Sequence, residues 1–279
     1  MRAAHLKMAT PSVFAGISSP KLPLAIALRP IRAGQTGKGR QAAQVPAMSR
    51  YEARPLAHGP LGTPRRSAGM LVTLSGRRLP PQRVAVVAKR RRPAAIPKGA
   101  RWIHVDLKQQ TLVAYEGDRP VRATLVSTGK PGTATRAGLY RGISKVRLSD
   151  MRGRTPEPYV AEAVRHVQHF WLGQALHGAW WHDGFGAVRS HGCINLAPAD
   201  ARWLFAWAPP PLPEGWRGIL PAAADPALYV LIEKRTPTGP VAAPELKLDN
   251  DRRCIDRGAD AAGLECPFEA LEGAPQQVL

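Results

Sequence analysis

The most informative stretch of this chain is Ser190-His191-Gly192-Cys193-Ile194-Asn195, which places a thiol beside a histidine and a glycine. A second histidine lies sixteen positions before the cysteine, in Ala175-Leu176-His177-Gly178. A thiol is a useful nucleophile only as the thiolate, and a free pKa of about 8.5 leaves little thiolate at neutral pH. A neighbouring imidazole corrects this by accepting the proton. The two segments therefore predict a cysteine–histidine site, with N–H groups beside Cys193 as a possible oxyanion hole and glycines that let the backbone approach a ligand.

Upstream of these segments the sequence has the pattern of a β-meander. Ile103, Val105 and Leu107 alternate with polar residues, which is the period of a half-buried strand. Further strands are expected at 111–115, 121–127, 138–140, 146–148, 159–160, 167–172 and 228–232, with a hairpin connection at 116–118. The expected fold is mixed and β-dominated.

One helix is expected after the cysteine. Pro198 suits the first turn of a helix, and Asp200 is favourable near that end. Trp203, Leu204 and Trp207 share one helical face, and the prolines at 209–211 end the helix. The folded domain is placed at residues 101–235.

The two segments resemble the signature of L,D-transpeptidase catalytic domains of the YkuD type. The resemblance covers about residues 101–235 and implies a β-sandwich or barrel with one or two short helices, flanked by disordered tails. One departure lies at Thr135-Arg136-Ala137-Gly138, where family members commonly have proline after the threonine. That segment is expected to be scaffold.

The resemblance also implies a role for each residue of the site. Cys193 would be the nucleophile and His177 the general base, with the backbone carbonyl of Gly178 orienting the imidazole. His191 would line the site, Ser190 and Gly192 would shape the loop, and Asn195 would hold it by hydrogen bonds.

The implied reaction is acyl transfer on peptidoglycan stem tetrapeptides. A thioester forms with loss of D-Ala, and an amine of a neighbouring stem then completes a 3→3 crosslink. No metal or organic cofactor is required, and carbapenems should acylate the same thiol. The substrate places such an enzyme in the periplasm or cell envelope, although no stretch of the sequence is a convincing secretion signal.

Three other side-chain sets near the motif have alternative interpretations. Trp180 and Trp181 lie between the two motif halves, so one of them is expected in the substrate groove, although aromatic residues here are more often core. Arg189 could meet a stem-peptide carboxylate or remain solvated. His182 with the motif residues could form a zinc set, but its spacing matches no common zinc pattern, so no metal site is predicted. His166 and His169 are expected at a surface or strand edge.

Charge is concentrated in residues 1–100, which hold nineteen Lys and Arg and one acidic residue, whereas the remainder holds twenty-one basic and nineteen acidic residues. This region is interpreted as mostly disordered, with one possible strand at 84–88, and as a contact for polyanions or the anionic envelope. Because it has few aromatic residues, no specific nucleic-acid readout is expected. No run reaches the eighteen apolar residues of a membrane span.

The C-terminal region, 236–279, is Pro-rich and contains Cys254 and Cys266. In an oxidising compartment these two could form a disulfide, and two reduced thiols fit nearly as well. Two alternatives to the transpeptidase remain open: a cysteine hydrolase of the same fold that trims stem peptides, and an inactive protein that binds cell wall or polyanions.

Overall fold

The computed structural model describes residues 17–18, 20, 22–28, 53–55, 57, 66–67, 70–74, 76, 78–79, 81–153, 159–234 and 246–247. Its larger sheet has the strand order β1-β10-β9-β8-β17-β11-β18. The strands are β1 (Ile17–Ser18), β8 (Arg101–Asp106), β9 (Thr111–Glu116), β10 (Arg119–Leu125), β11 (Gly138–Arg141), β17 (Tyr229–Glu233) and β18 (Leu246–Lys247). The expected meander over 101–127 is confirmed by the antiparallel pairing of β8, β9 and β10.

A second sheet has the order β15-β14-β13-β12-β16. It contains β12 (Ser144–Gly153), β13 (Tyr159–Trp171), β14 (Gln174–Gly178), β15 (Ile194–Leu196) and β16 (Gly218–Ile219). The strands expected at 159–160 and 167–172 are one strand, β13. Among the described residues the two sheets stay separate, so the β-dominated fold is sandwich-like rather than a closed barrel.

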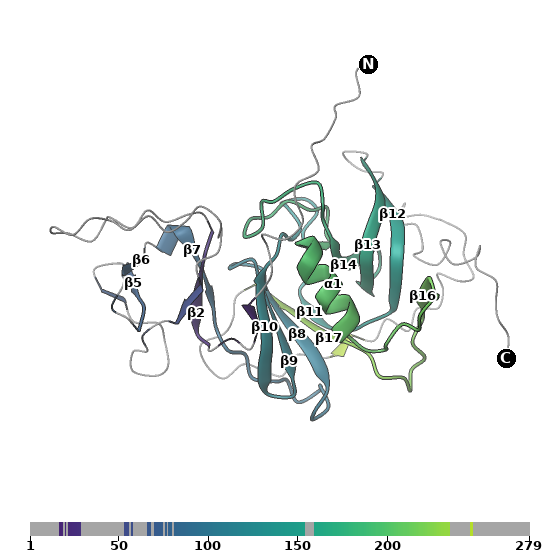
Figure 1. The fold of residues 1–279 in the computed structure, drawn as a ribbon, viewed down its shortest axis with the longest axis horizontal. Helices are drawn as coiled ribbons and strands as arrows, with labels where there is room; N and C mark the ends of the chain where they lie inside the picture. Colours follow the sequence, from purple (N-terminus) through teal and green to yellow (C-terminus); the bar gives the residue numbers. More distant parts are fainter. Residues whose placement is uncertain are drawn as a thin grey trace, which may run out of the picture.

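The only α-helix of the described residues, α1 (Pro198–Trp207), lies between the strands β8–β10 and the strands β12–β14 (Figure 1). It begins at Pro198 and ends before the prolines, as predicted. Leu204 is buried in the core, and Trp203 and Trp207 pack against it. No helix among the described residues is long and apolar enough to span a membrane.

Strand β8 is buried on both faces, so the expectation of a half-buried strand is wrong. Ile103 and Val105 pack in the core that contains α1. Trp102 faces the opposite side, in a second core that includes Leu24 and Val87. Residues that precede the catalytic region in sequence therefore cover the outer face of the larger sheet.

These covering residues form two small sheets, with the orders β3-β2-β7 and β4-β5-β6. They comprise β2 (Leu24–Ala27), β3 (Ala53–Pro55), β4 (Arg66–Ser67), β5 (Met70–Val72), β6 (Arg78–Leu79) and β7 (Val84–Val87), with a short 3₁₀ helix η2 (Pro81–Arg83) before β7. Strand β7 confirms the strand expected at 84–88. At β2 and β5 the structure differs from the expected disorder, because Leu24 and Ile26 of β2 pack against the larger sheet, while Leu71 of β5 packs against Ala25 on the other face of β2.

An ion pair joins the chain after β7 to the end of the larger sheet. The Arg90 guanidinium donates to both carboxylate oxygens of Glu233, from Nε at 2.9 Å and from Nη2 at 3.0 Å. His104 Nε2 lies 3.0 Å from the same carboxylate. Burial alone would raise the pKa of Glu233, but the hydrogen bonds from His104 and Arg90 outweigh it and hold the pKa at about 2.

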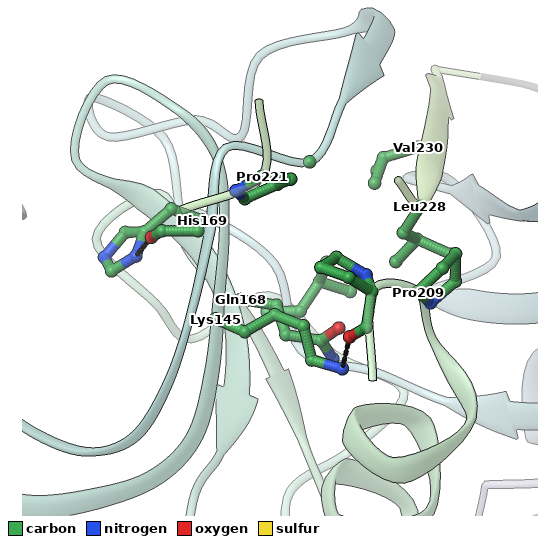
Figure 2. A pocket seen from close by; sticks show the side chains of 11 residues that line it. Lys145, Gln168, His169, Pro209, Pro221, Leu228 and Val230 are labelled. Atoms are coloured by element: carbon green, nitrogen blue, oxygen red, sulfur yellow. Dashed lines mark hydrogen bonds between the residues drawn. The ribbon is translucent and has the colours of Figure 1, made fainter. Parts of the chain in front are cut away.

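Two buried cations fix the ends of α1. Arg122 on β10 donates to Asp200 in the first turn, from Nε at 3.0 Å and from Nη2 at 2.7 Å. Lys145 on β12 donates to the carbonyls of Phe205, Ala208 and Pro210 at 2.7, 2.6 and 2.8 Å, which satisfies carbonyls that a helix end leaves unpaired. Figure 2 shows one of these hydrogen bonds as a dashed line from Lys145, beside a small pocket that shares no residue with the groove described below.

Candidate active site

Two adjacent parallel strands bring the motif halves together. Strand β14 pairs with β15 so that His177 is opposite Asn195. Because Cys193 immediately precedes β15, this register brings the cysteine to the strand that carries His177. Ser127 pairs with Asn195 from the other side, with its N–H 3.0 Å from Asn195 O and its carbonyl 2.8 Å from Asn195 N. Both neighbours of this short strand are thus fixed by the sheet.

His177 has one tautomer set by its backbone neighbour. The ring is buried, and its Nδ1 lies 3.1 Å from the carbonyl oxygen of Gly178. A carbonyl oxygen can only accept, so Nδ1 carries the proton and donates it, leaving Nε2 with a lone pair. Burial lowers the pKa of His177 to about 4, against a smaller opposing effect of the Gly178 hydrogen bond. The imidazole is neutral at pH 7 and can accept a proton at Nε2.

Cys193 is half-buried, and its thiol donates to the carbonyl of Gly173 at 3.7 Å. Burial raises the pKa of Cys193 to about 11, and a backbone hydrogen bond at Ala175 offsets this in part. The resting side chain is therefore a thiol, and chemistry at its sulfur requires a base to remove the proton.

The turn before Cys193 is held by hydroxyl groups. Ser190 Oγ accepts from Gly192 N at 3.1 Å and donates to the carbonyl of Cys193 at 2.5 Å. Thr135 Oγ1 donates to Gly192 O at 2.7 Å, so the segment that lacks the family's proline supports this turn directly. Because its N–H is already bonded to Ser190, Gly192 does not supply a free donor to an oxyanion hole here.

Glycine is needed at position 192 for its backbone conformation. Gly192 has φ +129°, in the region that L side chains rarely adopt, and a Cβ there would lie 3.0 Å from the amide nitrogen of Gln174. Gly178 differs, since a Cβ there would meet Ala201 Cβ on α1 at 3.4 Å, an ordinary contact. Glycine at 192 is thus required by its backbone conformation and by Gln174, whereas Gly178 faces the helix, and the expected close approach of either glycine to a ligand stays a prediction.

A groove of about 460 Å³ opens over the cysteine. It brings together most of the predicted site residues, namely Cys193, His177, His191, Ser190, Asn195, Arg189, Trp180 and Trp181. Of the two tryptophans, Trp180 is the more exposed, at 52%. Phe170 and Phe185, which lie near the two tryptophans in the sequence, are buried, so the aromatic residues of this region divide between groove and core.

The opposite wall of the groove comes from the β12–β13 hairpin, through Met151, Tyr159, Val160, Ala161 and Glu162. The Tyr159 ring stacks on His191, with centroids 4.5 Å apart and an interplanar angle of 17°. Burial and the neighbouring Cys193 raise the pKa of Tyr159 to about 12, so its phenol stays protonated. None of these residues was predicted to belong to the site, because the pairing of β12 with β13 leaves no local signal in the sequence.

Two histidines outside the predicted set have defined partners. His169 is buried and its Nδ1 lies 2.8 Å from Ser144 Oγ, so the expectation of a surface position is wrong for it. His182 contacts Asn195 through its ring. Within the described ranges, no group of three or more His, Cys, Asp or Glu side chains is placed to hold a metal ion. Cys254 and Cys266 lie outside the described residues.

Comparison with known proteins identifies the family that this part of the chain resembles. Residues 100–238 match the YkuD family, the L,D-transpeptidase catalytic domain. L,D-transpeptidase 1 of Mycobacterium tuberculosis is 32% identical over 109 residues, which are 36% of this chain and 43% of that protein. This chain therefore spans less than half the length of the curated relative it matches.

Solved structures that resemble part of this chain are also L,D-transpeptidases. One is an L,D-transpeptidase from Mycobacterium smegmatis, with 24% identity, coverage of 48% of this chain and 58% of that chain, and a TM-score of 0.39. Another is the catalytic domain of the Enterococcus faecium L,D-transpeptidase, with 25% identity, coverage of 48% and 98%, and a TM-score of 0.38.

His177 on β14 and Cys193, which directly precedes the parallel strand β15, both lie in the part of the chain that matches this family, and L,D-transpeptidases are a class of transferases. Residues 100–238 are a member of the YkuD family of L,D-transpeptidase catalytic domains.

Proposed function

We propose that the chain is a cysteine-dependent L,D-transpeptidase that acts on peptidoglycan stem tetrapeptides. The observation that carries this proposal is the orientation of His177, whose Nδ1–H is bonded to Gly178 O while Cys193 lines the same groove. A neutral imidazole with a free lone pair beside a protonated thiol is the arrangement that a nucleophilic cysteine needs.

The first step forms an acyl-enzyme. The sulfur of Cys193 attacks the carbonyl carbon that joins the third residue of the stem to its terminal D-Ala, and the thiol proton moves to Nε2 of His177. His177 then gives this proton to the amide nitrogen as the C–N bond breaks. D-Ala leaves with a free amine, and a thioester remains on Cys193.

The second step resolves the thioester. The side-chain amine of a neighbouring stem attacks the thioester carbon, and the C–S bond breaks. His177 takes a proton from the attacking amine and returns one to the thiolate, which restores both groups and leaves a 3→3 crosslink. Water, a free D-amino acid or a lipoprotein lysine are alternative acceptors.

Other residues of the groove position the substrate. His191, held by its stack on Tyr159, orients the acyl group, and Arg189 meets a stem-peptide carboxylate. Trp180 and Trp181 supply apolar surface. The basic N-terminal region contacts anionic components of the envelope, where the peptidoglycan substrate would place the enzyme.

Mass spectrometry of the full 279-residue chain tests the nucleophile. After incubation with imipenem, the protein should gain one covalent adduct, and the Cys193→Ala variant should gain none. A His177→Gln variant keeps similar volume without the base, and its adduct should form about 10²–10⁴-fold more slowly. A folded wild-type protein that takes no adduct would refute the proposal.

Product analysis separates the transferase from its alternatives. With purified tetrapeptide muropeptides, the transpeptidase should yield new crosslinked dimers and free D-Ala. Tripeptide monomers alone would identify the hydrolase of the same fold. Binding to cell wall that is unchanged in Cys193→Ala, with no product from either protein, would identify a binding protein.

A further inference from the structure

His182 has a defined role in this site that its place in the sequence does not reveal. It lies between the two motif halves, and its ring packs on Phe185 with centroids 4.8 Å apart. It does not line the groove, whereas Asn195, which it contacts, does. The histidine thus lies behind a groove residue.

The tautomer of His182 follows from its backbone contact. The N–H of Gly184 donates to His182 Nδ1 at 3.2 Å, so Nδ1 must hold a lone pair. Burial and the Arg189 charge lower the pKa of His182 to about 4, against an opposing effect of Asp183. The ring is therefore neutral at pH 7, and its single proton is on Nε2.

That proton fixes the orientation of the Asn195 side chain. In the structure, Nε2 of His182 lies 3.0 Å from Nδ2 of Asn195, and an Nε2–H and an NH₂ group that face each other cannot form a hydrogen bond. The two ends of a carboxamide have nearly the same shape, so the stable arrangement turns the oxygen toward His182. The NH₂ group of Asn195 then lies on the side away from His182, where it has no hydrogen-bond partner among the described residues.

The backbone of Asn195 allows it little other freedom. Its strand is bonded to Ser127 on one side and pairs with His177 on the other. With the main chain held on both sides, only the side-chain torsions remain, and the His182 contact fixes these.

We propose that His182 is a positioning residue, whose Nε2–H holds the Asn195 carboxamide so that its NH₂ donates to the acyl portion of a substrate in the groove. This inference rests on the proposed function and adds a side-chain donor near Gly192, whose own N–H is bonded to Ser190. An orientation locked before the substrate arrives avoids reorganisation during the reaction.

Matched variants of the full chain test the two contacts separately. His182→Asn keeps an acceptor near the Nδ1 position for Gly184 but is too short to reach Asn195. His182→Gln keeps an amide donor near the Nε2 position. Asn195→Asp keeps the acceptor that faces His182 and removes the NH₂ donor.

The readout compares two reactions of Cys193. Acylation by imipenem should fall about 10–100-fold in His182→Asn and in Asn195→Asp, and the double variant should fall no further than the slower single variant. His182→Gln should stay within about threefold of the wild type. Alkylation by iodoacetamide, in which the sulfur displaces iodide from a CH₂ carbon and no oxyanion forms at a carbonyl, should change less than about threefold in every variant. A parallel loss of alkylation, or additive effects in the double variant, would overturn the proposal.

A spectroscopic measurement decides the tautomer independently of activity. Long-range ¹H–¹⁵N correlation spectra of the ¹⁵N-histidine-labelled chain at pH 7 should show a protonated Nε2 and a bare Nδ1 for His182, assigned by its absence in His182→Asn. A protonated Nδ1 would overturn the inference even in an active enzyme. If the wild type were not acylated at all, the proposed function would fail, and the spectrum would still decide the orientation.

Discussion

The buried pair of Arg122 and Asp200 should be the most sensitive link between the larger sheet and α1. The side chains are 9% and 2% exposed, and two hydrogen bonds of 3.0 and 2.7 Å join them. Thr124 Oγ1 donates to the second carboxylate oxygen at 2.6 Å, and Trp203 lies 4.7 Å from the guanidinium carbon. The substitution Arg122→Met keeps the length of the side chain and removes its charge.

The cost follows from the carboxylate that remains. Removing one partner of a buried ion pair destabilises by about 3–5 kcal/mol, because the other charge stays buried without compensation. Thr124 still donates to Asp200, and the helix N-terminus favours the anion, so the lower end of about 3 kcal/mol applies. At about 2–4 °C per kcal/mol, Tm should fall by about 6–12 °C.

Thermal unfolding of the full chain followed by circular dichroism measures this effect. Arg119→Met on the same strand is the matched control, because Arg119 is 65% exposed and pairs with Glu116 at the surface. Its Tm should shift by about 2 °C or less. Arg122→Met/Asp200→Leu, which removes both charges, should recover part of the loss. Equal shifts for Arg122→Met and Arg119→Met would refute the reasoning.

Three further predictions follow from other sites. Alkylation of Cys193 by iodoacetamide should accelerate about tenfold per pH unit from pH 7 to 9, because the thiolate fraction does so below a pKa of about 11; a flat profile would indicate a preformed ion pair. Arg90→Gln should lower the urea unfolding free energy at pH 7 by about 1.5–3 kcal/mol. The pKa of Glu233 is depressed to about 2, so the stability that its carboxylate contributes is present above about pH 4.5 and is lost toward pH 2. The difference in unfolding free energy between the wild type and Arg90→Gln should therefore shrink as the pH falls toward 2. A difference that stays constant with pH would contradict this prediction. Gly186→Ala should lower Tm more than Gly132→Ala. Both glycines have positive φ, but only at position 186 would the new methyl group meet a side chain, 2.5 Å away. Equal shifts in Tm would show that this side-chain contact does not matter.

The sequence was sufficient where local pattern and local structure coincide. The hairpin at Gly117 and the helix that begins at Pro198 follow from turn chemistry and helix propensity, and both are present. The motif also located Cys193, His177 and Asn195 in one groove, because strand pairing places them together.

The sequence was insufficient where distant segments meet. The burial of His104 depends on residues from before position 100, whose sparse apolar runs gave little indication of a packed layer. Tyr159 reaches His191 only because β13 pairs with β12 and extends over the groove. The contact between His182 and Asn195 likewise required the loop geometry, and local periodicity carries none of this information.

The parallel pairing of β14 with β15 also accounts for the spacing of the motif. A tight hairpin cannot join parallel neighbours, which need a connection of about a dozen residues or more. Residues 179–193 form that connection, and they include Trp180 and Trp181 of the groove wall. Chain geometry thus sets a minimum number of residues between the two motif halves, and the chemistry of the site sets no maximum. Insertions that fall between His182 and Arg189 would alter the groove wall and leave Cys193 and His177 in register, so such insertions would change substrate selectivity without displacing the reacting groups.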